Sequence, residues 1–194
     1  MRTFISALAL TLLLTVITGL AYPLAVCGLA EAIFPAQARG SLIVQGDKIV
    51  GSSLIGQNFS SARYFQGRPS AAGDKGYDAA SSGGSNLGPT NKALIEAVRL
   101  RAKNFVESNP GTAAQQVPID IVTTSASGLD PEISPAAADL QVARVARVRA
   151  LSEDQVRRLI AENTRPRTAG IFGEPGVNVL LLNLALDRIA AKSS

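Results

Sequence analysis

The sequence predicts an α+β protein in which one N-terminal transmembrane helix precedes a single small domain of mixed sheet and helices outside the cytoplasm. Three observations lead to this fold class. Positions 3 to 30 carry no charged residue, several later segments have helical periodicity, and short β-branched stretches lie between turn-forming residues.

The uncharged stretch is long enough to cross a membrane as one helix. Thr3 to Tyr22 reach roughly 30 Å as an α-helix, which is the thickness of a hydrocarbon core. A cleaved signal peptide has an apolar region of only about 7 to 15 residues. We therefore expect a membrane anchor over residues 1–34 and a soluble α+β domain over residues 35–194.

The charges that flank the anchor predict its orientation. Arg2 and the terminal amine precede it, whereas the first charge after it is the acidic Glu31. The positive-inside rule then places the N-terminus in the cytoplasm and the domain outside.

One face of the anchor carries small side chains at every fourth position: Ala7, Thr11, Thr15 and Gly19. Such a stripe lets another helix approach closely in lipid, so these residues are candidates for a partner interface. The alternative is that each threonine only bonds the carbonyl four residues before it.

Composition excludes several functions. The chain has no histidine and a single cysteine, Cys27, within the anchor. We therefore expect no disulfide, no thiolate metal cluster, no metal site and no histidine-based catalysis. The net charge of +4 comes mostly from scattered arginines, which argues against nucleic-acid binding. Nothing in the spacing identifies a catalytic pair, so we assign no catalytic residue and no bound cofactor.

The remaining elements follow from periodicity and caps. We expect a hairpin over 42–50, a helix over 91–109, a strand over 117–122, a helix over 135–149 that begins at Ser134-Pro135, a second helix after the capping box at Ser152, and a strand or helix over 177–190 whose second half is helical.

A loop over residues 57–89 separates the hairpin from the first soluble helix and is unusually long for a compact domain. It holds four of the nine aromatic residues of the chain, together with two arginines, a composition favoured at interfaces. The equal alternative is that the aromatics pin the loop to the core. The interface candidates in this loop are Asn58, Phe59, Tyr64, Phe65, Arg68, Ser85 and Asn86.

Gly83 to Gly88 has the glycine spacing of a phosphate-binding loop, but Pro89 stands where the essential lysine would be. Proline also removes a backbone N–H. We therefore interpret this segment as a turn before the next helix, with Pro89 near its first position.

Taken together, the motifs resemble the KdpC family, the C subunit of the bacterial Kdp potassium-transporting ATPase. The resemblance is collinear over nearly the whole chain. It rests on Gln57-Asn58-Phe59, Tyr64-Phe65 with Gly67-Arg68-Pro69-Ser70, Gly83 to Pro89, Leu129-Asp130-Pro131, Gln141 with Arg144-Val145-Ala146, Gly173-Glu174-Pro175, and Leu182 to Asp187.

The resemblance implies an accessory subunit of the bacterial inner membrane, and the orientation predicted from the flanking charges would place its domain in the periplasm. Its partners would be a channel-like A subunit that carries potassium and a P-type B subunit that hydrolyses ATP. The family's C subunit is held to stabilise the assembly and to act as a catalytic chaperone that raises the affinity of the B subunit for ATP. ATP would act through that partner, and potassium would be the transported ion.

The resemblance also implies a nucleotide contact through a glutamine that matches Gln141, with Arg144 one turn along the same helix. ATP is cytoplasmic, so the predicted topology conflicts with a direct contact. Two hypotheses follow. Either the domain lies outside and acts through its partners, or it faces the cytoplasm as a co-chaperone and touches ATP through Gln141. A third interpretation is that Gln141 and Arg144 form a helix surface pair that supports the fold.

Overall fold

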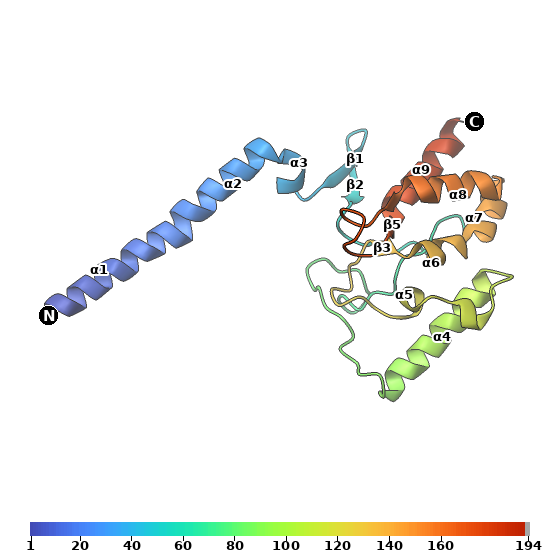
Figure 1. The fold of residues 1–194 in the computed structure, drawn as a ribbon, viewed down its shortest axis with the longest axis horizontal. Coiled ribbons are helices and arrows are strands. Elements are labelled where there is room, and N and C mark those ends of the chain that lie inside the picture. The colour runs from blue at the N-terminus through green and yellow to red at the C-terminus, as the bar shows by residue number, and fades with distance from the viewer. Residues whose placement is uncertain (193–194) are drawn as a thin grey trace. The chain divides into compact units, whose positions relative to one another are not determined.

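The computed structural model describes residues 1–192 and divides into two compact units, Met1–Ser52 and Ser53–Ser194 (Figure 1). The first unit contains the β-hairpin as well as the apolar helix. The boundary at residue 34 between membrane anchor and soluble domain stays a prediction.

The first unit begins with one uninterrupted helical rod, as Figure 1 shows. It consists of α1 (Arg2–Val16), a π-helical turn η1 (Ile17–Ala21) and α2 (Tyr22–Ile33). The π turn lies where Pro23 lacks the N–H that would bond the carbonyl of Gly19. Within the helical span Arg2–Ile33, an 18-residue window has a mean hydropathy of 2.3 and none of it is buried, so this helix is long and apolar enough to cross a membrane.

A short helix α3 (Pro35–Ala38) leads into the predicted hairpin, which is confirmed as β1 (Leu42–Gln45) and β2 (Lys48–Ser52). The antiparallel strands are joined by the two residues Gly46 and Asp47, and the φ of +58° at Gly46 suits glycine. Ile43 is opposite Gly51 and Val44 is opposite Ile49, so the register skips Val50 and marks a bulge in β2.

The second unit contains the other helices and a three-stranded sheet. Its helices are α4 (Lys92–Ser108), the 3-10 turn η2 (Ala114–Gln116), α5 (Ile119–Val122), α6 (Pro135–Asp139), α7 (Val142–Arg149), α8 (Glu153–Glu162) and α9 (Val179–Lys192). The predicted caps are confirmed: Ser134 accepts from the N–H of Ala137, and Ser152 forms a capping box with Gln155.

Two of the predicted elements in this unit differ from the structure. The strand expected over 117–122 is a helical turn, because Pro118 caps α5 and the Asp120 carboxylate accepts hydrogen bonds from both the N–H and the hydroxyl of Ser134. The helix expected over 135–149 is interrupted at Gln141. There the side chain donates to the carbonyl of Ala137, while the backbone N–H turns to Ala138.

The sheet has the order β3-β5-β4 and is antiparallel throughout, with β3 (Glu132–Ile133), β4 (Thr164–Arg165) and β5 (Gly176–Asn178). The segment predicted as strand or helix is therefore a short strand followed directly by α9. The core lies between this sheet and the helices, where α8 packs against α6, α7 and α9. Its fully buried apolar side chains include Phe65, Leu182, Leu186, Val142 and Val177.

Candidate functional site

Gln141, between α6 and α7, is fully buried and holds the backbone of the long loop. Its side-chain oxygen accepts from the N–H of Gln66 at 2.8 Å, and its nitrogen donates to the carbonyl of Gln66 at 3.2 Å. The same nitrogen donates to the carbonyl of Ala137 at 3.1 Å. The amide of Gln141 thus bonds Gln66 as a neighbouring strand would.

Arg144 is only 3% exposed and uses its guanidinium on the same loop. Nη1 donates to the carbonyls of Ala62 and Tyr64 at 2.5 and 2.9 Å. Nε donates to the side-chain oxygen of Asn109, and Nη2 to that of Gln141. All four acceptors are amide oxygens, so dipoles stabilise the buried charge. Burial lowers the pKa of Arg144 to about 10, and the group therefore stays charged at neutral pH.

A second amide, that of Asn183 in α9, repeats the arrangement one residue earlier in the loop. Its oxygen accepts from the N–H of Phe65 at 2.8 Å, and its nitrogen donates to the carbonyl of Phe65 at 3.0 Å. The ring of Phe65 is fully buried in the core. We call residues 62–66 together with Gln141, Arg144, Asn109 and Asn183 the loop clamp.

Arg149 extends the loop clamp toward the surface. Its Nε donates to the carbonyl of Arg63, and its Nη2 pairs with the carboxylate of Asp187 at 2.8 Å. The guanidinium lies over the ring of Tyr64, 4.9 Å from the centroid, and the Tyr64 hydroxyl donates to the other oxygen of Asp187. Phe59 packs against the same ring at 5.5 Å between centroids.

These contacts answer part of the sequence analysis. Gln141 and Arg144 do support the fold, but from the interior and not as a surface pair. Phe65 pins the loop to the core, and Tyr64 and Phe59 are partly buried above it. Asn58 is exposed and stays a candidate for a partner interface.

The sequence analysis missed Asn109, Arg149, Asn183 and Asp187 as members of this cluster. Asn109 was interpreted only as the end of a helix. Of these four residues, Asn183 is the one whose role could have been predicted from the sequence. It lies inside the apolar run Leu180 to Leu186, and a buried amide there must find hydrogen-bond partners.

Arg68 and Asp130 form a second polar contact on the loop, with Nη1 2.9 Å from the carboxylate. The Arg68 Nε is buried without a hydrogen-bond partner among the described atoms. The carbonyl of Arg68 accepts from the hydroxyl of Tyr77 at 2.6 Å.

Tyr77 gives this part of the loop a pH dependence. Burial raises the pKa of its phenol above the ordinary value of 10.0. The unfolded chain therefore loses this proton first, so the stability that the neutral phenol contributes is present below pH 10 and is lost as pH rises through the folded pKa. We expect the denaturant midpoint of the chain to fall more between pH 8 and 10.5 than that of a Tyr77→Phe variant. Equal falls in both chains would contradict the assignment.

The glycine-rich segment lies along residues 125–128. The N–H of Gly83 donates to the carbonyl of Ser127 at 2.8 Å, and Gly128, with φ +67°, passes so close to Gly83 that a Cβ would lie 2.5 Å from the Gly83 carbonyl oxygen. Ser85 and Asn86 are exposed and stay interface candidates. The expectation for Pro89 is wrong: the helix begins later, because Asn91 caps α4.

The small-residue stripe of α1 also has a definite geometry. The Thr11 hydroxyl donates to the carbonyl of Ala7 at 2.9 Å, and the Thr15 hydroxyl donates to the carbonyl of Thr11 at 2.8 Å. Each threonine therefore does bond the carbonyl four residues before it, as the alternative interpretation states. Gly19 lies within the π-helical turn, where the backbone hydrogen bonds span five residues instead of four. The stripe stays exposed along the helix, and its docking role stays a prediction.

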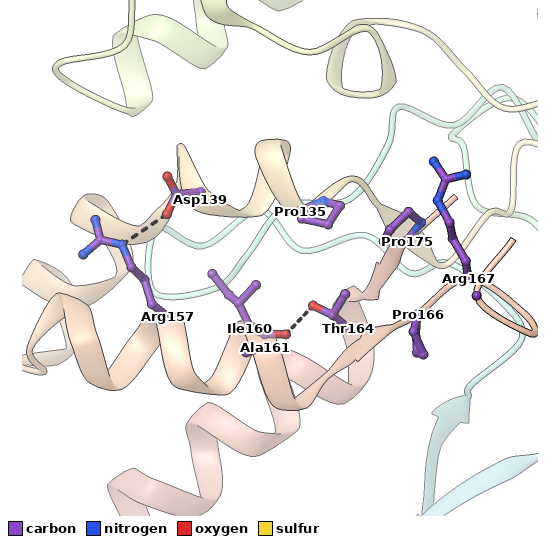
Figure 2. Close-up of a pocket in the computed structure, with 10 residues that line it drawn as sticks. Pro135, Asp139, Arg157, Ile160, Ala161, Thr164, Pro166, Arg167 and Pro175 are labelled. Atoms are coloured by element: carbon purple, nitrogen blue, oxygen red, sulfur yellow. Dashed lines mark hydrogen bonds and ion pairs between the residues drawn. The ribbon is translucent and has the colours of Figure 1, made fainter. Parts of the chain in front are cut away.

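A groove of about 760 Å³ opens between α6, α8 and the loop that joins β4 to β5. Figure 2 shows Ile160 with the rings of Pro135, Pro166 and Pro175 along it, and Arg157 and Arg167 at opposite ends. The Thr164 hydroxyl donates to the carbonyl of Ile160, so it offers no free donor to the groove.

Comparison with known proteins gives the family. The KdpC family, described as "K+-transporting ATPase, c chain", matches residues 4–188. The chain is 60% identical over 185 residues to a potassium-transporting ATPase KdpC subunit of Variovorax paradoxus, covering 95% of each chain. It is 57% identical to the corresponding subunit of Polynucleobacter asymbioticus, covering 94% of this chain and 96% of the relative. It is 55% identical to that of Bradyrhizobium diazoefficiens, covering 96% of both. The chain therefore belongs to the KdpC family and is a subunit of a potassium-transporting ATPase complex.

Proposed function

We propose that this subunit is a non-catalytic component of the complex that stabilises the assembly of a channel-like A subunit with a P-type B subunit. It raises the affinity of the B subunit for ATP without touching the nucleotide. In this proposal the B subunit hydrolyses ATP, and potassium crosses the membrane through the A subunit.

The state of Gln141 carries this proposal. Its oxygen accepts two hydrogen bonds, from Gln66 and Arg144, and its nitrogen donates two, to Gln66 and Ala137. A glutamine amide has two acceptor sites and two donors, so none is left for a ligand. A nucleotide could bind here only if the loop clamp opened, which favours coupling through the complex over direct contact.

The charge pattern of the apolar helix supports the same conclusion. Arg2 precedes it and Glu31 follows near its other end, so the positive-inside rule favours a cytoplasmic N-terminus and a second unit on the outer side of the inner membrane. ATP would then be on the opposite side from Gln141.

Labelling of a single cysteine tests this topology. In a Cys27→Ser background, Leu100→Cys places a thiol on α4 at a side chain that is 60% exposed. We expect a membrane-impermeant maleimide to label it in intact cells. Thr3→Cys in the same background, at the other end of the span, should be labelled only after the membrane is broken.

The opposite labelling pattern would overturn the proposal and place the second unit in the cytoplasm. A direct contact between Gln141 and ATP would then become the preferred hypothesis. Titration of ATP into the purified subunit gives an independent check, because the proposal predicts no binding without the B subunit.

A further inference from the structure

The loop between β4 and β5 presents two large apolar side chains to solvent. Ile171 and Phe172 are 69% and 66% exposed and are neighbours in the chain. The tip is closed by two backbone bonds: the N–H of Thr168 donates to the carbonyl of Phe172 at 2.8 Å, and the N–H of Phe172 donates to the carbonyl of Thr168 at 2.9 Å. These bonds hold the tip in a compact turn that keeps both side chains outside.

The exposed tip is continuous with the apolar groove. Pro166, Arg167, Gly170 and Pro175 of the same loop line one side of the groove, and Ile160 of α8 lies across from them (Figure 2). A partner protein could therefore make two kinds of apolar contact here: it could enclose the projecting aromatic side chain, and it could insert its own side chains into the groove. Large aromatic anchors in such settings provide much of the affinity of protein interfaces.

The charges at the rim of the groove limit what can bind. Arg157 is shared among the carboxylates of Asp139, Glu153 and Asp154, at 3.2, 2.8 and 3.8 Å. At the other end Arg167 pairs with Glu174 at 2.6 Å.

Two arginines therefore face four carboxylates, and the side chains of Asp154 and Glu174 are 83% and 78% exposed. The chain as a whole carries +4, so this rim is a local region of opposite sign. A net negative rim repels an anionic lipid surface and attracts a basic side chain.

We propose that the Ile171-Phe172 tip and the adjoining groove form a docking surface for an apolar segment of another subunit of the pump, and that this segment carries a lysine or arginine. The inference rests on the proposed function and names a contact through which the assembly is stabilised. The partner segment covers Phe172 and lies along Pro166 and Pro175, and its basic residue pairs with the carboxylates around Arg157.

Protection of a thiol at the tip tests the inference. In a Cys27→Ser background, Phe172→Cys is compared with Leu100→Cys, whose exposure in the free subunit is similar. The other subunits are added in an excess that keeps the complex assembled even though Phe172→Cys removes the aromatic ring. In the assembled complex we expect maleimide labelling at position 172 to slow at least about tenfold, since interface cores exclude water, and labelling at position 100 to change little. Equal labelling rates at position 172 in the free subunit and in the complex would overturn the inference.

The same variants in lipid vesicles separate a protein partner from a membrane. Protection of position 172 in the isolated subunit reconstituted in vesicles with anionic lipid, without the other subunits, would assign the tip to the bilayer and overturn the inference. Labelling as fast as in detergent supports a protein partner.

Assembly itself gives a second readout that is independent of labelling. Phe172→Ala should weaken binding to the other subunits about 30-fold, as expected for an interface anchor. Ile119→Ala, which removes a side chain that is 70% exposed on α5, should leave the affinity unchanged. Asp154→Lys should also weaken binding, since it reverses a charge at the rim.

The outcomes distinguish the two proposals. If the unmodified chain does not copurify with the A and B subunits, the proposed function fails and the docking surface with it. If it does, and Phe172→Ala assembles with unchanged affinity, only the docking surface is overturned. Thermal unfolding of each variant shows whether a loss of assembly reflects a loss of fold.

Discussion

Replacing Arg144 with methionine should lower the free energy of unfolding by about 3 kcal/mol, which corresponds to a fall in Tm of roughly 10 °C for a unit of this size. The variant leaves the carbonyls of Ala62 and Tyr64 and the side-chain oxygen of Asn109 without their donor. Each orphaned acceptor costs about 1–3 kcal/mol, and relief from burying the charge offsets part of this. Thermal unfolding of the full chain in detergent, followed by circular dichroism, measures the effect.

Two variants sharpen this result. Arg147→Met makes the same change at an exposed position of α7 and should shift the stability by no more than about 0.5 kcal/mol. Arg144→Lys keeps the charge but not the planar array of donors, so we expect it to lose nearly as much stability as Arg144→Met. Full stability of the lysine variant would show that charge, and not hydrogen-bond geometry, is what the loop requires.

Phe65→Ala should cost about 3–5 kcal/mol, since the ring is fully buried and its removal leaves a cavity in the core. The peptide group of Phe65 would keep its two bonds to Asn183, so the loss comes from the ring. Urea titration of the full chain gives the difference in the free energy of unfolding. An unchanged urea midpoint would show that the core closes over the missing ring.

Phe172→Ala is the matched control, because it removes the same atoms from a side chain that is 66% exposed. Its free energy of unfolding should stay within about 0.5 kcal/mol of the unmodified chain. The pair separates two effects on assembly: Phe65→Ala would weaken it through the fold, and Phe172→Ala through a lost contact.

Local sequence rules predicted those parts of the fold whose determinants are local. The helix Lys92–Ser108 ends at the asparagines that cap it, and Ser152 with Gln155 fixes the start of α8. The hairpin of the first unit follows from two short apolar strands around Gly46.

The rest depends on contacts between distant residues. The sheet strands are two or three residues long, too short for any alternation of side chains to identify them. The break at Gln141 arises because its side chain bonds Gln66, far away in the sequence. Pro118 shows the limit of propensity, since the β-branched residues around it suggested a strand where proline caps a helical turn.

The sequence identifies several residues of the candidate site, but it does not predict that they are buried or which residues they contact. The resemblance identified Gln141 and Arg144, and the aromatic composition identified Tyr64 and Phe65. Helical periodicity assigns polar side chains to the exposed face, so it placed Arg144 at the surface. Only the folded chain shows that the arginine and the aromatic loop are two sides of one cluster.

The loop clamp has a consequence for how this domain opens. A long loop without regular structure is normally among the first parts of a protein to exchange its amide hydrogens with solvent. Here the N–H groups of Phe65 and Gln66 bond side chains that belong to α9 and to the junction of α6 and α7. Those amides can reach solvent only when the helices separate, so the middle of the loop opens together with the core as one cooperative unit.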